Sequence, residues 1–148
     1  FLHIATAMAM VGGIFGFLLL YLRARRASSD ADARDTVGNA IALNRWLVIV
    51  GGGLAGVIGF VLMARYDAKG IFDAGKQVWI HIAVLLWLVV LGIAGVVQRM
   101  TRRALADGST SDARAALSNS ATNILVWLNA LVALVILYFM VFKPFIRD

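Results

Sequence analysis

The chain has 148 residues, of which 61% are hydrophobic and 15% are charged, with a formal net charge of +6. Soluble globular domains average roughly 45–50% apolar and about 25% charged residues, so this composition excludes that class and predicts an integral membrane protein. The sequence contains no cysteine, which excludes disulfides, zinc–thiolate sites, iron–sulfur clusters and thiol catalysis.

Four apolar runs follow one another along the chain, and none of them contains Lys, Arg, Asp or Glu. They lie at residues 1–22, 46–64, 79–97 and 124–142. At about 1.5 Å per residue, a helix of roughly 20 residues crosses a hydrocarbon core of about 30 Å. The sequence therefore predicts an all-α integral membrane protein, a four-helix bundle that forms a single transmembrane domain over residues 1–148.

The basic residues lie between or beyond the apolar runs, where membrane proteins place them, so the positive charge does not indicate a nucleic-acid partner. Five Lys or Arg residues fall in connection 23–45 and four in connection 98–123. Three fall in connection 65–78 and two in the tail 143–148. By the positive-inside rule, connections 23–45 and 98–123 are predicted to be cytoplasmic, with both termini outside the bacterial cytoplasmic membrane.

The two cytoplasmic connections carry helix-start signals. Ser29 and Ser109 each offer a hydroxyl N-cap with an aspartate three residues later, which is close to a capping box. Alanine-rich sequence without proline then leads to the next apolar run. We therefore expect the second and fourth helices to begin in these connections and to continue into the membrane.

The chain also repeats itself. The pattern Ser-x-x-Asp-Ala-Arg-x-x-x-x-Asn begins at Ser29 and again, 80 residues later, at Ser109. His3-Ile4-Ala5 similarly reappears 78 residues later, beginning at His81. These matches predict two tandem helical hairpins, residues 1–66 and 79–144, related by duplication and by a pseudo-twofold axis along the membrane normal.

His3 and His81 are the candidate site residues, since each lies near the same predicted end of a span. His3 precedes Arg23 by 20 residues and His81 precedes Arg99 by 18, so their depths are expected to differ by roughly 3 Å. Two imidazoles at one depth on neighbouring helices could ligate a b-type haem axially, or form a copper site together with Met8. The alternative is that both histidines are structural and bond to water, lipid headgroups or other polar groups.

Small residues predict close helix packing, because lipid removes the hydrophobic drive that brings helices together in water. The glycines assigned to such contacts are Gly12, Gly16, Gly52, Gly56 and Gly59. The glycine run at 51–53 lacks the Lys-Ser/Thr of a phosphate loop. Asn129 lies midway along the fourth span and is expected to hydrogen-bond to another helix.

Three short motifs carry a family resemblance: Leu2-His3-Ile4 followed by Gly12-Gly13, the second histidine-bearing span, and Val141-Phe142-Lys143-Pro144. Together they resemble an uncharacterised bacterial family of predicted integral membrane proteins with four spans. The chain is more distantly similar to the copper-resistance D-type proteins and to the small membrane protoporphyrinogen oxidase. The latter resemblance implies that His3 contacts haem or porphyrin. Residues 79–97 lack the lysine that the oxidase family has in a later span, which argues against oxidase activity.

The spans lack several residue types that particular functions require, and this reduces the number of possible functions. No span carries an acidic residue, which argues against ion-coupled transport, and there is no Ser-His-Asp set or carboxylate pair for hydrolysis. The leading hypothesis is therefore a non-catalytic accessory or assembly subunit of a larger membrane complex, in contact with lipid and with a membrane-protein partner or a second copy. The rival hypothesis is a redox protein that binds haem b, or less favourably copper, through His3 and His81.

Overall fold

The computed structural model describes residues 1–66, 78–106 and 117–142, and these residues are almost entirely helical. Along the chain the helices are α1 (Leu2–Arg25), α2 (Asp30–Leu43), the π-helical segment η1 (Asn44–Val50), α3 (Gly51–Tyr66), α4 (Val78–Ala106) and α6 (Ser120–Phe142). No strand occurs in this part of the chain. Four helical stretches of the described residues are long and apolar enough to cross a membrane, which confirms the predicted all-α membrane bundle.

α2, η1 and α3 follow one another without a break and form one helical rod, in which Asp30–Arg65 is a candidate span of 36 residues. At about 1.5 Å per residue this stretch is about 54 Å long, well beyond a hydrocarbon core of about 30 Å. The Ser29 side chain accepts a hydrogen bond from the Asp32 amide at 3.2 Å, which caps the first turn. The predicted start of the second helix within connection 23–45 is therefore confirmed.

The fourth helix starts differently. α6 begins at Ser120, and the Asn119 side chain accepts a hydrogen bond from the Ala121 amide at 2.9 Å. The backbone of Asn119 is not helical, whereas Asn39, its counterpart in the repeated pattern, lies inside α2. An asparagine side chain that accepts a hydrogen bond from the amide two residues later caps the start of a helix. The predicted cap at Ser109 lies outside the described residues.

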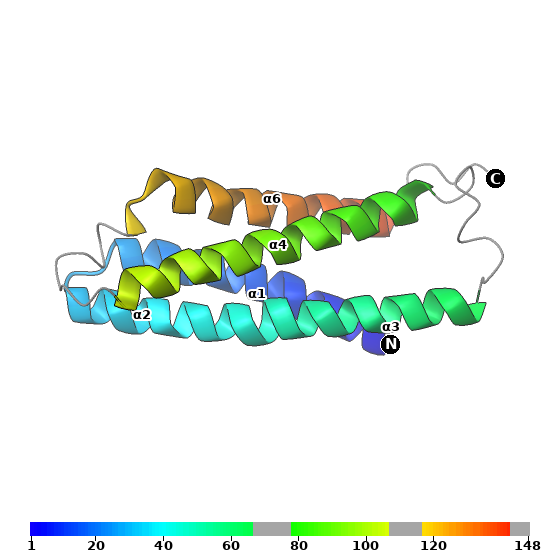
Figure 1. Cartoon of the computed structure of the whole chain (residues 1–148), viewed down its shortest axis with the longest axis horizontal. Coiled ribbons are helices and arrows are strands. Elements are labelled where there is room, and N and C mark those ends of the chain that lie inside the picture. Colours follow the sequence, from blue (N-terminus) through cyan, green and yellow to red (C-terminus); the bar gives the residue numbers. More distant parts are fainter. Residues whose placement is uncertain (67–77, 107–116, 143–148) are drawn as a thin grey trace.

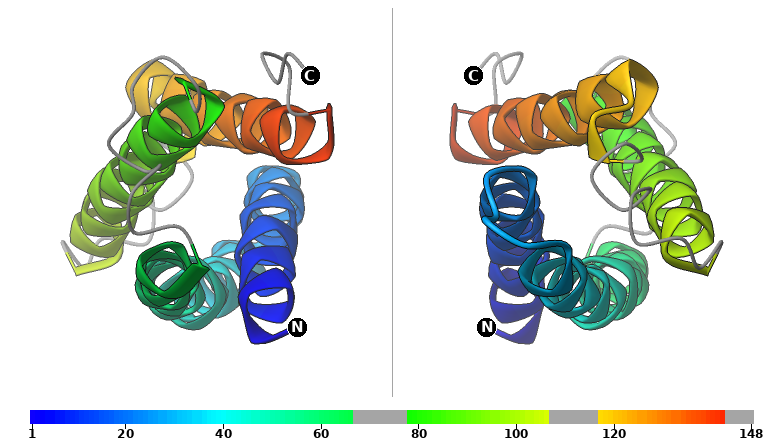
Figure 2. Two further views of the ribbon diagram at one scale, coloured as in Figure 1. Left: turned by 90° about the vertical axis from the view of Figure 1, so that its right-hand side faces the viewer. Right: turned by 90° about the vertical axis from the view of Figure 1, so that its left-hand side faces the viewer.

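The helices are arranged as a ring. In the end-on views they follow one another in the order α1, α3, α4, α6 (Figure 2). α1 packs against α2, η1, α3 and α6, whereas α4 packs against α6, η1 and α2. α1 and α4 therefore lie diagonally across the bundle. These two helices run in one direction, and the α2–α3 rod and α6 run in the other (Figure 1).

The outward faces of the helices are strongly apolar. Large hydrophobic side chains that are more than half exposed occur on every long helix, for example Leu19, Phe60, Leu85 and Leu131. A soluble monomer rarely exposes apolar surface on this scale, but a bilayer solvates it. Together with the four candidate spans, this surface identifies the lipid bilayer as the surroundings of the bundle.

Polar side chains fasten α1 to the chain around the start of α6. The hydroxyl of the buried Tyr21 donates to the Leu117 carbonyl at 2.7 Å. Nearby, Nη1 of Arg25 donates to Oδ1 of Asn123 at 3.0 Å. These bonds hold together the half of the bundle in which α1 and α4 end (Figure 1).

Candidate functional site

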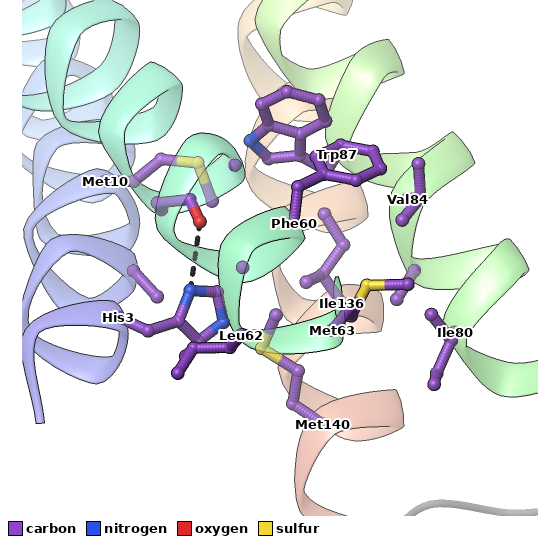
Figure 3. A pocket seen from close by; sticks show the side chains of 15 residues that line it. His3, Met10, Phe60, Leu62, Met63, Ile80, Val84, Trp87, Ile136 and Met140 are labelled. Atoms are coloured by element: carbon purple, nitrogen blue, oxygen red, sulfur yellow. Dashed lines mark hydrogen bonds between the residues drawn. The ribbon is translucent and has the colours of Figure 1, made fainter. Parts of the chain in front are cut away.

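A pocket lies between α1, α3, α4 and α6, in the half of the bundle where α1 begins and α3 ends. Its volume is about 230 Å³. Two of its lining residues, Phe60 and Leu62, are exposed, so the pocket reaches the outer surface of the bundle at α3. Its walls are nearly all apolar (Figure 3) and are formed by His3, Ala7, Met10, Ala55, Gly56, Gly59, Phe60, Leu62, Met63, Ile80, Ala83, Val84, Trp87, Ile136 and Met140.

His3 lies at the wall of the pocket where α1 meets α3. Its Nδ1 is 2.9 Å from the Ala55 carbonyl oxygen, and because a carbonyl only accepts, Nδ1 is the donor. A Cβ on Gly59, one turn further along α3, would lie 3.0 Å from the imidazole Cε1, so the glycine leaves room for the ring. A neutral imidazole that donates from Nδ1 carries its lone pair on Nε2. In Figure 3 this second nitrogen points toward Leu62 and Met140.

Trp87 closes the pocket toward the middle of the bundle. Its Nε1 donates to the Gly52 carbonyl at 3.0 Å, and its ring occupies the space beside Gly56, where a Cβ would collide with it. A Cβ on Gly52 would lie 2.9 Å from the Met10 sulfur. Gly52, Gly56 and Gly59 therefore face one side of α3, where their missing side chains make room for Met10, the Trp87 ring and His3.

The two glycines of α1 that the sequence assigned to packing differ. Gly16 lies against Leu43, whose Cδ2 would be 3.1 Å from an added Cβ. Gly12 borders open space, since a Cβ there would meet nothing within 4 Å. Among the glycines of α1, the tightest contact with the rod is instead at Gly13, where a Cβ would lie 2.6 Å from the Leu47 Cβ. Successive residues are about 100° apart around a helix, so Gly12 and Gly13 face different surroundings.

His81 does not line this pocket. It is exposed on α4, whereas Ile80, Ala83 and Val84 of the same helix face the cavity. α1 and α4 lie diagonally and are not the neighbours that the sequence analysis assumed. The volume of about 230 Å³ is also below the roughly 300–1,000 Å³ of pockets that enclose drug-sized ligands. A haem held axially between His3 and His81 therefore does not fit this arrangement.

The copper ligands expected from the sequence, His3, Met8 and His81, do not lie together either. Met8, which was to join His3 and His81, is 69% exposed on α1. Among the described residues, no group of three or more His, Cys, Asp or Glu side chains is placed to hold a metal ion. Three other methionines, from three different helices, line the pocket with His3: Met10, Met63 and Met140.

Asn44 is a buried polar residue that the sequence analysis missed. It is 2% exposed, and its Nδ2 donates to the Ala94 carbonyl and to Oε1 of Gln98, both at 3.1 Å. The only feature of the sequence that could have indicated this buried residue is the position of its amide, two residues before the predicted second span. Asn129, which was expected to bond to another helix, is 7% exposed, and its Oδ1 has no hydrogen-bond partner in the described parts of the chain.

The molecule is a small integral membrane helix bundle. It has four apolar helical stretches, an outer surface suited to lipid and a largely apolar pocket. A family model described as "Predicted integral membrane protein (DUF2269)" matches residues 1–144. The chain belongs to this DUF2269 family, which confirms the expected membership of a family of predicted integral membrane proteins. No curated protein and no solved structure matches the chain. The more distant resemblance to copper-resistance D-type proteins and to the oxidase stays a prediction.

Proposed function

We propose that this chain is a non-catalytic membrane protein that binds a small ligand in the pocket at His3. The observation that supports this proposal is an apolar cavity containing one oriented imidazole. Ligand sites typically combine apolar walls with a few polar groups that fix the orientation of the ligand. A volume of about 230 Å³ suits a small molecule, an ion, or the end of a lipid-like molecule.

The lining residues favour binding over catalysis. None of the fifteen has a carboxylate, hydroxyl, thiol or amine side chain, so His3 has no nucleophile or second acid–base group beside it in the pocket. The indole N–H of Trp87 already donates to the Gly52 carbonyl. A nucleophile of the Ser, Cys or Thr type needs an adjacent base, and the pocket offers no such nucleophile for His3 to activate.

The orientation of the bundle belongs to the same proposal. α1 and α4 end, and α2 begins, at one end of the bundle (Figure 1). Seven arginines lie in the sequence near these helix ends: Arg23, Arg25, Arg26, Arg34, Arg99, Arg102 and Arg103. The positive-inside rule makes that end cytoplasmic, in a bacterial cytoplasmic membrane. The pocket then lies in the outer half of the bilayer, and a ligand enters from the outer side.

Filling the pocket tests its role as a ligand site. Ala83 is buried and lines the cavity, so Ala83→Phe places a ring inside it, whereas Leu85→Phe changes the exposed face of the same helix. The full chain and both variants are purified from native membranes in mild detergent, and bound lipids, small molecules and metals are measured by mass spectrometry. We expect one stoichiometric species in the wild type and in Leu85→Phe, reduced about tenfold or more in Ala83→Phe.

Circular dichroism and monodisperse elution verify that each variant is folded. A folded wild-type protein that carries no bound species would contradict the proposal. A species that Ala83→Phe retains at the wild-type level would contradict it as well, because that species would bind elsewhere.

A second proposal, an accessory subunit, is favoured by the exposed face of α4. Gly92 and Gly95 lie on this face, and a Cβ at either position would meet nothing within 4 Å. Small residues that face lipid let a partner helix approach closely. The double variant Gly92→Leu with Gly95→Leu should therefore reduce the native size of a complex with a membrane protein or a second copy. Val57→Leu, on the exposed side of α3, is the control. Migration of the wild type as a monomer in gentle extracts rules this candidate out.

A further inference from the structure

Three of the five methionines of the chain line the pocket, and each comes from a different helix: Met10 on α1, Met63 on α3 and Met140 on α6. Methionine commonly fills gaps in apolar cores. Here the three side chains line the pocket, together with the ring of His3 (Figure 3). A thioether sulfur is a soft, uncharged metal ligand, and an imidazole nitrogen also binds copper. The pocket therefore combines apolar walls with atoms that ligate soft metals.

We propose that the pocket binds one soft monovalent cation, Cu(I) or its analogue Ag(I), through Nε2 of His3 and the sulfurs of Met63 and Met140. This inference rests on the proposed function, because it names the ligand of the same site. In Figure 3, Met140 lies on the side of the His3 ring away from the hydrogen bond to Ala55, and Met63 lies across the pocket. The sulfur of Met10 sits beside Gly52. Met10 is therefore not part of the proposed donor set.

The hydrogen bond between His3 and Ala55 supplies what a histidine ligand needs. A metal-binding imidazole commonly donates its second N–H to a carboxylate or a backbone carbonyl, which fixes the tautomer and the ring orientation. The Nδ1 to carbonyl distance of 2.9 Å provides this contact, and the missing side chain of Gly59 admits the ring. Nε2 then offers its lone pair to the pocket with no change in the position of the ring.

The types of side chain that line the pocket also determine which metal ions could bind there. Mg²⁺ and Ca²⁺ need oxygen ligands, mainly carboxylates, and zinc sites are built from Cys, His or carboxylate groups. The fifteen lining residues include no carboxylate and no cysteine, and His3 is the one histidine among them. In an apolar cavity an uncompensated charge is costly, so neutral donors suit a single positive charge better than a double one. Thioether ligands select Cu(I) among the biological metals.

Binding of Cu(I) to the purified full chain tests this inference. The affinity is measured by competition with a coloured Cu(I) chelator in the presence of ascorbate, and the measurement is repeated with Ag(I), which needs no reductant. We expect one ion per chain and no comparable binding of Zn²⁺. Met63→Leu and Met140→Leu keep a similar apolar volume but lose the sulfur, so each should weaken binding by about tenfold or more. His3→Phe should weaken binding further.

Two methionines outside the pocket provide matched controls. Met8 is exposed on the same helix as His3, and Met100 lies toward the far end of α4. Met8→Leu and Met100→Leu should bind Cu(I) as the wild type does. X-ray absorption of the Cu(I) form should show sulfur and nitrogen neighbours in the wild type, and the sulfur contribution should disappear in the Met63→Leu, Met140→Leu double variant.

The outcomes separate this inference from the proposed function. Equal Cu(I) affinity of the wild type and the folded double variant overturns the metal site. If Cu(I) and Ag(I) do not bind, while Ala83→Phe removes a co-purified organic molecule, the ligand pocket stands and the metal inference falls. If neither metal nor any molecule occupies the pocket of the wild type, both fall.

Discussion

Asn44 and Asn129 are both almost fully buried, but their amide groups meet different surroundings. The Asn44 amide donates to Ala94 and Gln98 on α4, while Oδ1 of Asn129 has no partner in the described helices. Hydrogen bonds between helices in membranes contribute about 0.6 kcal/mol on average and up to about 1.7 kcal/mol. A buried polar atom without a partner destabilises the fold instead. The two asparagines should therefore respond oppositely to the same substitution.

We expect Asn44→Leu to lower the free energy of unfolding by about 1–2 kcal/mol, because two hydrogen bonds are lost and Gln98 loses a donor. Asn129→Leu should leave stability unchanged or raise it, because an apolar side chain of similar size replaces an amide whose Oδ1 has no partner among the described residues. Thermal unfolding of the full chain in detergent, followed by circular dichroism, compares the two variants. A larger loss for Asn129→Leu than for Asn44→Leu would show that this account of the two amides is wrong.

At the level of single residues, the sequence identified part of the site and missed the rest for a geometric reason. A histidine in an apolar span is unusual enough to single out His3. Its companions are harder to find, because Met8 and Met10 lie about 200° apart around one helix. Met8 is 69% exposed and Met10 is 2% exposed. Which of them joins the pocket depends on the face that α1 turns toward α3, and nothing in the local sequence distinguishes the two faces.

Within α3, Gly53 and Gly56 are three residues apart but are not equivalent. A Cβ on Gly56 would collide with the Trp87 ring, whereas a Cβ on Gly53 would meet nothing within 4 Å. Gly56→Ala should displace Trp87, break its hydrogen bond to Gly52 and destabilise the bundle by about 1–3 kcal/mol. Gly53→Ala should be neutral or stabilise by up to about 1 kcal/mol, because glycine is unfavourable inside a helix.

Thermal unfolding of the two alanine variants measures this difference, and tryptophan fluorescence reports the position of Trp87. The chain has four tryptophans, so the same comparison in a Trp87→Phe background isolates the signal of this residue. In that background the cost of Gly56→Ala should shrink, since the smaller ring can yield. Equal stability of the Gly53 and Gly56 variants would contradict the close contact between α3 and α4.

The sequence predicted the four membrane-spanning helices, but it predicted the residues at which they begin less well. Hydropathy marks where a helix enters lipid, which placed the second span at Trp46. The helix itself begins at Asp30, and the cap at Ser29 is what indicated this. Before the fourth span the same reasoning did not foresee the start at Ser120, because the side chain of Asn119 caps the helix there. Several nearby Ser, Thr, Asn or Asp side chains can each cap a helix, so one capping residue in the sequence does not determine where the helix starts.

For the whole molecule, the order of the helices around the ring was beyond the sequence. In water, the apolar stripe of a helix identifies the face that packs. In a bilayer both the packed face and the lipid face are apolar, so this signal is weak. The sequence therefore predicted four spans correctly but placed the two histidine-bearing helices side by side. In the structure α1 and α4 lie diagonally across the bundle (Figure 2).

The orientation of the whole bundle can be tested with reporter fusions. Alkaline phosphatase is active only outside the cytoplasm, so a fusion after Tyr66, at the end of α3, should be active. A fusion after Ala106, at the end of α4, should be inactive, because the positive-inside rule predicts that the arginine-rich end of α1 and α4 is cytoplasmic. Green fluorescent protein fusions at the same positions should give the reverse pattern. If the fusion after Ala106 is active and the fusion after Tyr66 is not, the bundle has the opposite orientation and the pocket lies in the inner half of the membrane.

The rod formed by α2, η1 and α3 gives the molecule a mechanical property. Asp30 at its start and Ala55 at the pocket belong to one helix, and about 38 Å of continuous backbone separates them. No loop lies between them to absorb a displacement, and the wide turn of η1 is the one irregular segment. If the pocket binds a ligand as proposed, an axial shift of α3 would move the start of α2 at the opposite end of the same rod. Occupancy of the pocket would then change the position of Asp30, about 38 Å away along the helix axis.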